Sequence, residues 1–121
     1  MTADFDSQVL RITDDGVLIE VRFSVREIID ESVIQSIGQE LHSLIADRKQ
    51  PRLLMNFADV RHLSSSALGV LIDLEAAVQE RRGRLVLTEI ADSIREVFKI
   101  TKLDRTFDIQ AIASDARADL R

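Results

Sequence analysis

The spacing of the apolar residues changes along the chain, and this change constrains the fold more than any other feature. Apolar residues alternate with polar ones at Val17, Ile19, Val21 and Phe23, which is the period of a strand with one buried face. After Asp30 the period becomes three to four, as in an amphipathic helix, at Ile34, Ile37, Leu41, Leu44 and Ile45. Such a chain favours a sheet covered by helices.

The first half of the chain predicts a hairpin followed by a helix. Residues 9–12 and 17–23 flank the turn Asp14-Asp15-Gly16, so we expect them to pair as antiparallel strands. Asp30 can accept hydrogen bonds from the first free amides of the following helix as its N-cap. That helix is expected to end near Arg48.

The middle of the chain predicts a buried strand and a second helix. Pro51 precedes a short apolar run, residues 53–57, which is typical of an inner, largely buried strand. The polar turn Ser64-Ser65-Ser66 then leads into a helix for which Gly83 is the expected C-terminal cap. The residues expected to face inward on this helix are Leu68, Leu71, Leu74, Ala77 and Val78.

The last third predicts a strand at residues 85–87, a short helix and a final strand at residues 107–109. Ser93-Ile94-Arg95-Glu96 has the capping-box pattern of a helix start, and that helix is expected to bury Ile94, Val97 and Phe98. Residues 114–121 are expected to form a short helix or a frayed tail. Together these elements predict a single α/β domain over residues 1–121, with four to five strands covered by about four helices.

Composition argues against several classes of function. The sequence has no cysteine and only two histidines, His42 and His62, so disulfides and a structural metal are not expected. No apolar run approaches the roughly 18 to 20 residues that cross a bilayer, and the N-terminus is acidic, so we expect a cytoplasmic protein without membrane insertion. The net charge of −5 argues against nucleic acid as a partner. The basic residues Arg81, Arg82 and Arg84 are expected to complement the dipole of the second helix in solvent.

The turn Ser64-Ser65-Ser66 carries the most chemistry in the sequence. Ser64 or Ser65 is expected to cap the helix, so the hydroxyls lie beside free amides that carry roughly half a positive charge in total. A helix end of this kind can hold a phosphate. Gly69, on the first turn, lets another backbone approach closely. The simpler interpretation is that the three serines only cap a helix.

No catalytic residue, metal site or cofactor is predicted. A serine hydrolase needs a base held against its serine, but His62 is the only nearby histidine and no Gly-x-Ser-x-Gly elbow is present. Asp59 and His62 are too few ligands to hold a metal. The four glycines are scattered, so any phosphate has to come from a nucleotide that another protein binds.

Residues 59–71, Asp-Val-Arg-His-Leu-Ser-Ser-Ser-Ala-Leu-Gly-Val-Leu, resemble the signature of STAS domains, the family of anti-sigma factor antagonists. The positions that match are Ser65, Ser66, Leu68 and Gly69. Residues 94–109 are similar to the closing helix and strand of the family. The resemblance covers nearly the whole chain and implies a mixed β-sheet.

The resemblance further implies a bacterial partner-switching regulator that is not an enzyme and regulates transcription. It implies that Ser65 is phosphorylated by a serine kinase that is also an anti-sigma factor, and that a phosphatase acts on Ser65. The unphosphorylated form then binds this kinase and frees a sigma factor. The residues expected on the partner-binding surface are Asp30, Asp59, Ser64, Ser66 and Gly69.

The sequence departs from the family signature at positions that leave other functions open. Ser64 stands where the family usually has aspartate, Ala67 replaces a glycine, and residues 26–30 only loosely represent a Gly-Glu-Leu-Asp stretch. These departures favour an alternative, a constitutive STAS module of a transporter or scaffold complex without phosphorylation control. A small-ligand sensor is a third hypothesis, for which few aromatic residues are available to line a pocket.

Overall fold

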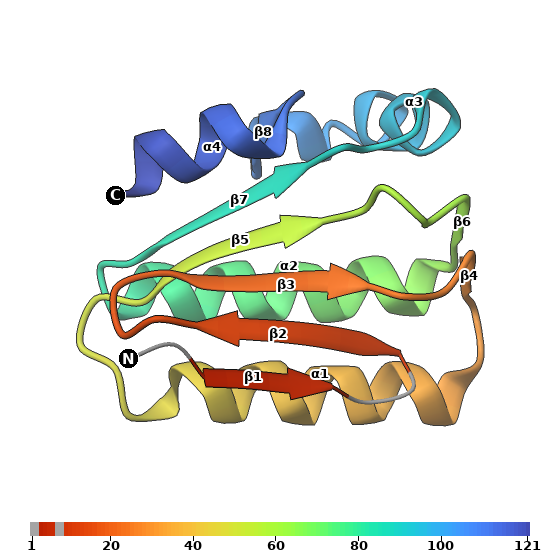
Figure 1. Cartoon of the computed structure of the whole chain (residues 1–121). Helices are drawn as coiled ribbons and strands as arrows, with labels where there is room; N and C mark the ends of the chain where they lie inside the picture. The colour runs from red at the N-terminus through yellow and green to blue at the C-terminus, as the bar shows by residue number, and fades with distance from the viewer. Residues whose placement is uncertain (1–2, 7–8) are drawn as a thin grey trace.

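The computed structural model describes residues 3–6 and 9–121, and a six-stranded mixed sheet forms its centre (Figure 1). The strands lie in the order β1 (Ala3–Asp6), β2 (Leu10–Asp14), β3 (Ile19–Phe23), β5 (Arg52–Asn56), β7 (Arg84–Thr88) and β8 (Asp108–Gln110). The pairs among β1, β2 and β3 are antiparallel, and those among β3, β5, β7 and β8 are parallel. The predicted α/β class and mixed sheet are confirmed, and β1 adds an edge strand.

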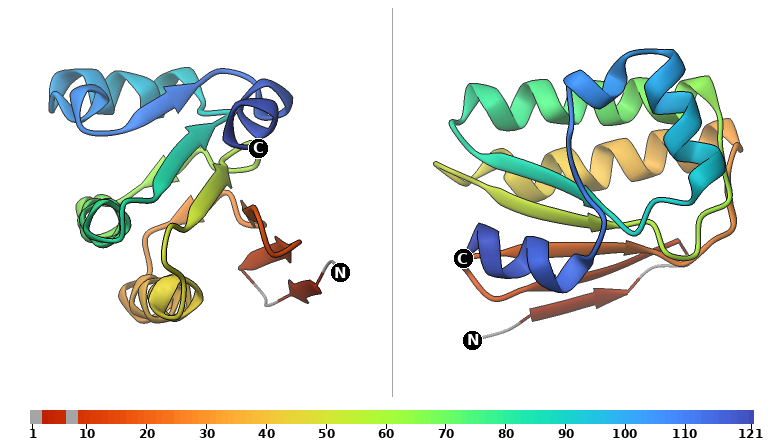
Figure 2. Two further views of the ribbon diagram at one scale, coloured as in Figure 1. Left: turned by 90° about the vertical axis from the view of Figure 1, so that its left-hand side faces the viewer. Right: turned by 90° about the horizontal axis from the view of Figure 1, so that it is seen from above.

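Helices cover the two faces of this sheet unequally. One face is covered by α1 (Glu31–Ala46) and α2 (Ser65–Glu80), and α3 (Asp92–Ile100) contributes to the same core. The opposite face is covered by α4 (Ala113–Leu120) alone among the described helices (Figure 2). The C-terminal segment therefore forms the short helix that was one of its two expected states. A 3₁₀ turn, η1 (Leu103–Arg105), leads from α3 to β8.

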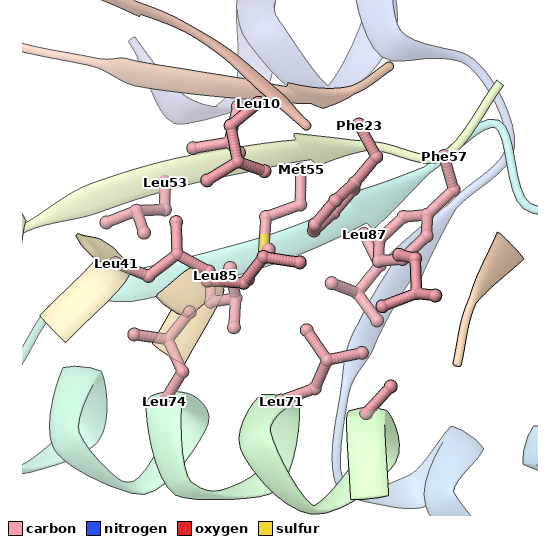
Figure 3. Packing of buried hydrophobic residues seen from close by; sticks show 14 of the residues in the cluster. Leu10, Phe23, Leu41, Leu53, Met55, Phe57, Leu71, Leu74, Leu85 and Leu87 are labelled. Carbon is pink, nitrogen blue, oxygen red and sulfur yellow. The ribbon is translucent and has the colours of Figure 1, made fainter. Parts of the chain in front are cut away.

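The main core lies between the sheet and the pair α1 and α2. Figure 3 shows Leu71 and Leu74 of α2 directed at the sheet, where Met55 and Leu85 meet them. The inward stripe of α2 is confirmed at Leu68, Leu71, Leu74 and Val78, while Ala77 packs at its margin as a partly buried residue. This stripe fixes which side of α2 faces solvent, and hence where its serines point.

Two residues that were expected to be buried are exposed. Val17 is 53% exposed because it lies in the turn before β3, and Leu18 is buried there instead, on the face that α4 covers. Val97 is 41% exposed because α3 contacts the core along a single narrow stripe, formed by Ile94 and Phe98. The period-two and helical patterns were therefore correct for most positions and wrong for these two.

The end of α2 does not use Gly83 as the left-handed residue. Arg82 takes that conformation, with φ of 57°, and the Gly83 amide donates to the Val78 carbonyl at 2.9 Å. A Cβ at Gly83 would lie 2.2 Å from the carbonyl oxygen of Pro51. Glycine is therefore required here by the close approach of the chain after α1, not by a positive φ.

Two other predictions about helix ends are wrong. The helix α3 begins at Asp92 with Ala91 as its N-cap and no side-chain cap, so Ser93 does not start it. The basic cluster after α2 does not simply face solvent. Arg81 donates to the Arg48 carbonyl at 3.2 Å, and Arg84 forms ion pairs with Asp108 of β8 and Asp119 of α4.

Candidate functional site

Two very short strands bring the starts of α1 and α2 to the same edge of the molecule. β4 (Glu27–Ile28) pairs in parallel with β6 (His62–Leu63), and each strand immediately precedes one of the two helices. The Ser64 amide extends the ladder by donating to the Ile28 carbonyl at 3.1 Å. Figure 1 shows β4 and β6 side by side at this edge. Because Asp30 follows β4 and the turn Ser64-Ser65-Ser66 follows β6, the pairing brings these residues near one another.

The start of α1 is capped by a charged group. An Asp30 carboxylate oxygen accepts from the amides of Ser32 and Val33, at 3.0 and 3.1 Å, and from the Ser32 hydroxyl at 2.7 Å. The Ser32 hydroxyl, followed by the Val33 amide, lowers the pKa of Asp30 below its ordinary value of 3.8. Glu31 adds a second acidic residue in the first turn. The predicted N-cap role of Asp30 is therefore confirmed, and this helix end already carries negative charge.

The start of α2 is capped by a neutral group. The Ser64 hydroxyl accepts from the Ala67 amide at 3.1 Å, so Ser64 and not Ser65 is the cap. The first turn contains no acidic residue. Ser65 and Ser66 are exposed, and their hydroxyls make no hydrogen bond to the described residues. The Ser65 hydroxyl is therefore accessible, and it lies at a helix end whose positive charge is not neutralised by a carboxylate of that helix.

Gly69 leaves open space one turn into α2. A Cβ built on Gly69 would meet no atom within 4 Å, so the backbone there faces outward. The neighbouring Leu68 and Leu71 point into the core and are 9% and 3% exposed. A partner can therefore approach the α2 backbone beside the serines without displacing a side chain.

Asp59 is engaged away from the serine turn. Its carboxylate forms an ion pair with Arg22 of β3 at 3.2 Å, and both side chains are 48% exposed. Because Ile19, Val21 and Phe23 of β3 face the main core, Arg22 lies on the opposite face of the sheet. The structure does not bring this carboxylate to the other candidate residues through any contact in the described part of the chain, and its role in partner binding stays a prediction.

Sequence reasoning missed a groove beside the serine turn. The groove lies between β6, the start of α2 and α3, and has a volume of about 130 Å³. The residues that line it are Arg61, His62, Leu63, Leu68, Ser93, Ile94 and Val97. The only signal for it in the sequence is Val97, an apolar residue out of phase with the buried stripe of α3.

The site offers little room or chemistry for a small ligand. The cavity beneath the starts of α1 and α2 is apolar and is lined in part by Phe23 and Phe57. Its volume of about 10 Å³ is at the lower limit of what holds a single water molecule. Within residues 3–6 and 9–121, no group of three or more His, Cys, Asp or Glu side chains is placed to hold a metal ion. What the arrangement provides is an exposed hydroxyl at a capped helix start.

The comparison with protein families decides the assignment. A family model, that of the STAS domain, matches residues 9–116. The chain belongs to the STAS domain family. The match includes every element from β2 to the first half of α4, and with them the serine turn.

Solved structures share the fold at low sequence identity. An anti-sigma factor antagonist from Mycobacterium paratuberculosis is 21% identical with a TM-score of 0.74, and the match covers 100% of this chain and 93% of that one. The Bacillus cell fate determinant SpoIIAA in its phosphorylated form is 16% identical, with a TM-score of 0.71 and full coverage of both chains. The TM-scores show that this STAS domain and these two proteins share a fold, and at such low identity the likeness shows the fold alone.

The fold also matches part of a much longer protein. The murine anion transporter Slc26a9 is 10% identical over 86% of this chain and 18% of its own, with a TM-score of 0.70. In the described part of the present chain, no helix has the length and apolar character needed to cross a bilayer.

Proposed function

We propose that this STAS domain is a bacterial, cytoplasmic anti-sigma factor antagonist whose binding to a serine kinase, itself the anti-sigma factor, is switched by phosphorylation of Ser65. The observation that carries the proposal is the exposed Ser65 hydroxyl at the start of α2, where the cap is neutral and the first turn has no carboxylate. In the switching step the Ser65 oxygen forms a bond to the γ-phosphorus of ATP, ADP leaves, and the hydroxyl proton passes to a base of the kinase. A phosphatase reverses the switch by hydrolysis.

The two states differ because the same charge acts oppositely inside the domain and across the interface. Phosphorylation adds about 1.5 to 2 negative charges. Within the domain, these charges meet the free amides at the start of α2, which favours the folded state. Across the interface, they have to lose water against a surface that fits a neutral hydroxyl, which opposes binding. We include Asp30, Ser64, Ser66 and Gly69 in the proposed surface because they belong to the starts of α1 and α2, which the β4–β6 pair brings to one edge of the molecule. Asp59 is included on the family resemblance alone, because its carboxylate pairs with Arg22 away from the serine turn.

The test is to map the phosphate. The chain is incubated with serine kinases of its host and ATP, and the phosphorylated residue is identified by mass spectrometry. Ser65 is the expected residue, and Ser65→Ala should abolish incorporation. Ser64→Ala and Ser66→Ala are matched controls that change one hydroxyl each and should still accept phosphate. Incorporation at another residue would contradict the proposal.

The second candidate is a constitutive STAS module of a transporter or scaffold complex. Ser64 and Ala67, which depart from the antagonist signature, favour it, as does the fold shared with a domain of an anion transporter. An immobilised chain that retains a transporter subunit, and takes no phosphate from any host kinase, would support this function.

A further inference from the structure

The helix α4 is attached to the sheet differently from α1 and α2. On the main face, α1 contributes Ile34, Ile37, Leu41 and Ile45, all buried to 4% exposure or less. On the opposite face, α4 contributes Ala113, Ala116 and Leu120. Two of these three side chains are single methyl groups, so α4 buries much less apolar surface than either long helix.

Charged groups supply most of the remaining contacts of α4. Arg117 donates to Glu20 of β3 through two nitrogens, at 2.9 and 2.6 Å. Asp119 accepts from Arg84 of β7 and from Gln110 of β8, both at 3.0 Å. Arg121, just after the helix, pairs with Asp15 in the hairpin turn.

The two ends of α4 are also held by charged side chains, one just after β7 and one in β5. The Ala113 amide donates to the Glu89 carboxylate at 2.7 Å, and the Leu120 carbonyl accepts from Arg52 at 3.0 Å. Glu89 has a φ of 57°, a conformation that costs free energy in a residue with a side chain. Its carboxylate contact with α4 is one of the interactions that keep Glu89 in this conformation.

We infer that α4 is an ionic strap, a cover that opens as a unit when its charge contacts are screened and thereby exposes the strip Leu18, Leu54 and Val86. The side chains of Arg117, Arg84, Asp119 and Arg121 are 39% to 50% exposed, so salt reaches them readily. A helix of eight residues does not persist in water without docking. Release of the strap is therefore the same event as unfolding of α4. Because α4 lies on the sheet face opposite α1 and α2 (Figure 2) and packs in a cluster separate from the main core, that core is expected to stay intact.

Hydrogen exchange measured by mass spectrometry tests the strap on the unmodified chain, without any partner. Exchange is compared at about 0.1 M and about 1 M NaCl, between which the Debye length falls from about 10 Å to about 3 Å. The α4 amides should exchange about tenfold faster at high salt, equivalent to about 1.4 kcal/mol in the local opening free energy. The amides of α2 around Leu74 should not change. Exchange of α4 that is insensitive to salt would overturn the inference.

A matched pair of variants separates charge from general loosening. Arg117→Gln should raise α4 exchange at low salt and reduce its salt dependence, because the pair with Glu20 is lost. Arg95→Gln removes an exposed arginine of α3 that makes no ion pair with the described residues, and it should behave as the wild type. The inference also fails if α4 exchanges only together with the central strands, since α4 would then not open as a separate unit.

Discussion

The starts of α1 and α2 are alike in position and opposite in charge. Both helices have 16 residues, both follow one strand of the β4–β6 pair, and both begin at the same edge of the molecule. The α1 start is filled by the carboxylates of Asp30 and Glu31, whereas the α2 start has the neutral cap Ser64. Two helix ends with the same amides therefore differ in how favourably they receive a new anion.

This difference determines at which helix start an added phosphate is stabilised. An anion added at the α1 start would meet carboxylates, and one added at Ser65 meets free amides of α2 together with the nearby Asp30 carboxylate. We therefore expect the amides of α2 to stabilise the folded, phosphorylated form, with the acidic start of α1 as a neighbour.

The largest effect on stability is expected from a substitution that detaches α2 from the sheet. Leu71 is 3% exposed, and Leu71→Asp places an unpaired charge in the core at a cost of several kcal/mol, a large share of the roughly 5 to 15 kcal/mol that stabilises a domain. We expect loss of the cooperative thermal melt. Ile72→Asp is the control, because Ile72 is 38% exposed and should tolerate the charge. A normal melt for Leu71→Asp would mean that the inward face of α2 is misassigned.

Leu68→Asp should be less severe than Leu71→Asp. Leu68 is 9% exposed and borders the groove between α2 and α3, so its carboxylate can reach water after a smaller rearrangement. The expected order of melting temperatures is wild type, then Leu68→Asp, then Leu71→Asp. Equal melting temperatures for the two variants would show that the groove does not hydrate this position.

The next largest difference in stability is expected between substitutions at Gly38 of α1 and Gly69 of α2. A Cβ at Gly38 of α1 would lie 3.3 Å from Val70, whereas one at Gly69 of α2 would meet nothing within 4 Å. Gly69→Gln should therefore keep or raise stability, by up to about 1 kcal/mol, while it weakens kinase binding. Gly38→Gln should lower stability by about 1 to 3 kcal/mol through overpacking. Thermal melts measure the stability of both variants, and a binding titration measures the affinity of Gly69→Gln for the kinase. Destabilisation by Gly69→Gln would show that Gly69 packs internally.

The caps should differ in their response to pH. The folded-state pKa of Asp30 lies below 3.8, so its contribution to stability is complete above pH 3.8 and is lost as the pH falls through that lowered pKa. The melting-temperature gap between wild type and Asp30→Ala should therefore close in acid. Ser64→Ala should lower the free energy of unfolding by about 1 kcal/mol. Because Ser64 does not titrate, the melting-temperature gap between wild type and Ser64→Ala should persist in acid. A gap for Asp30→Ala that is unchanged in acid would contradict the charged cap.

The smallest effect is expected from making the α2 start resemble the α1 start. Ser64→Asp keeps a capping side chain and adds a negative charge, so the unmodified domain should gain about 0.3 to 1 kcal/mol. Once Ser65 is phosphorylated, Ser64→Asp should raise the stability of the domain by less, or lower it, because two anions then share one helix end. Urea unfolding of both forms measures this. An equal gain in the two forms would show that the phosphate does not interact with the α2 start.

Periodic segments were predictable from the sequence because a long apolar period reports which face is buried. This holds for the hairpin of β2 and β3, for α1 with Asp30 as its cap, and for the stripe of α2. The pair β4 and β6 was missed, because strands of two residues have no period and form only where the folded chain brings them together. The position of α4 was missed as well, because an alanine-rich segment does not indicate which face of a sheet it covers.

The candidate site was predictable in its residue types and less so in its geometry. The serine pattern identified the start of α2, but only the structure distinguishes Ser64, which caps the helix, from the free Ser65. Asp59 was expected on the same surface, and its contact with Arg22 depends on the pairing of β3 with β5, which residue spacing does not specify.

A phosphate on Ser65 is expected to block partner binding without disturbing the fold. The direct measurement is calorimetric titration of the serine kinase that phosphorylates the chain with the unphosphorylated domain, the domain phosphorylated at Ser65, and Ser65→Asp. We expect the two anionic forms to bind at least about tenfold more weakly, a difference of about 1.4 kcal/mol, with melting temperatures equal to or slightly above that of the unmodified domain. Equal affinity of the phosphorylated and unphosphorylated forms would contradict the account, as would weaker binding that is accompanied by loss of the cooperative melt.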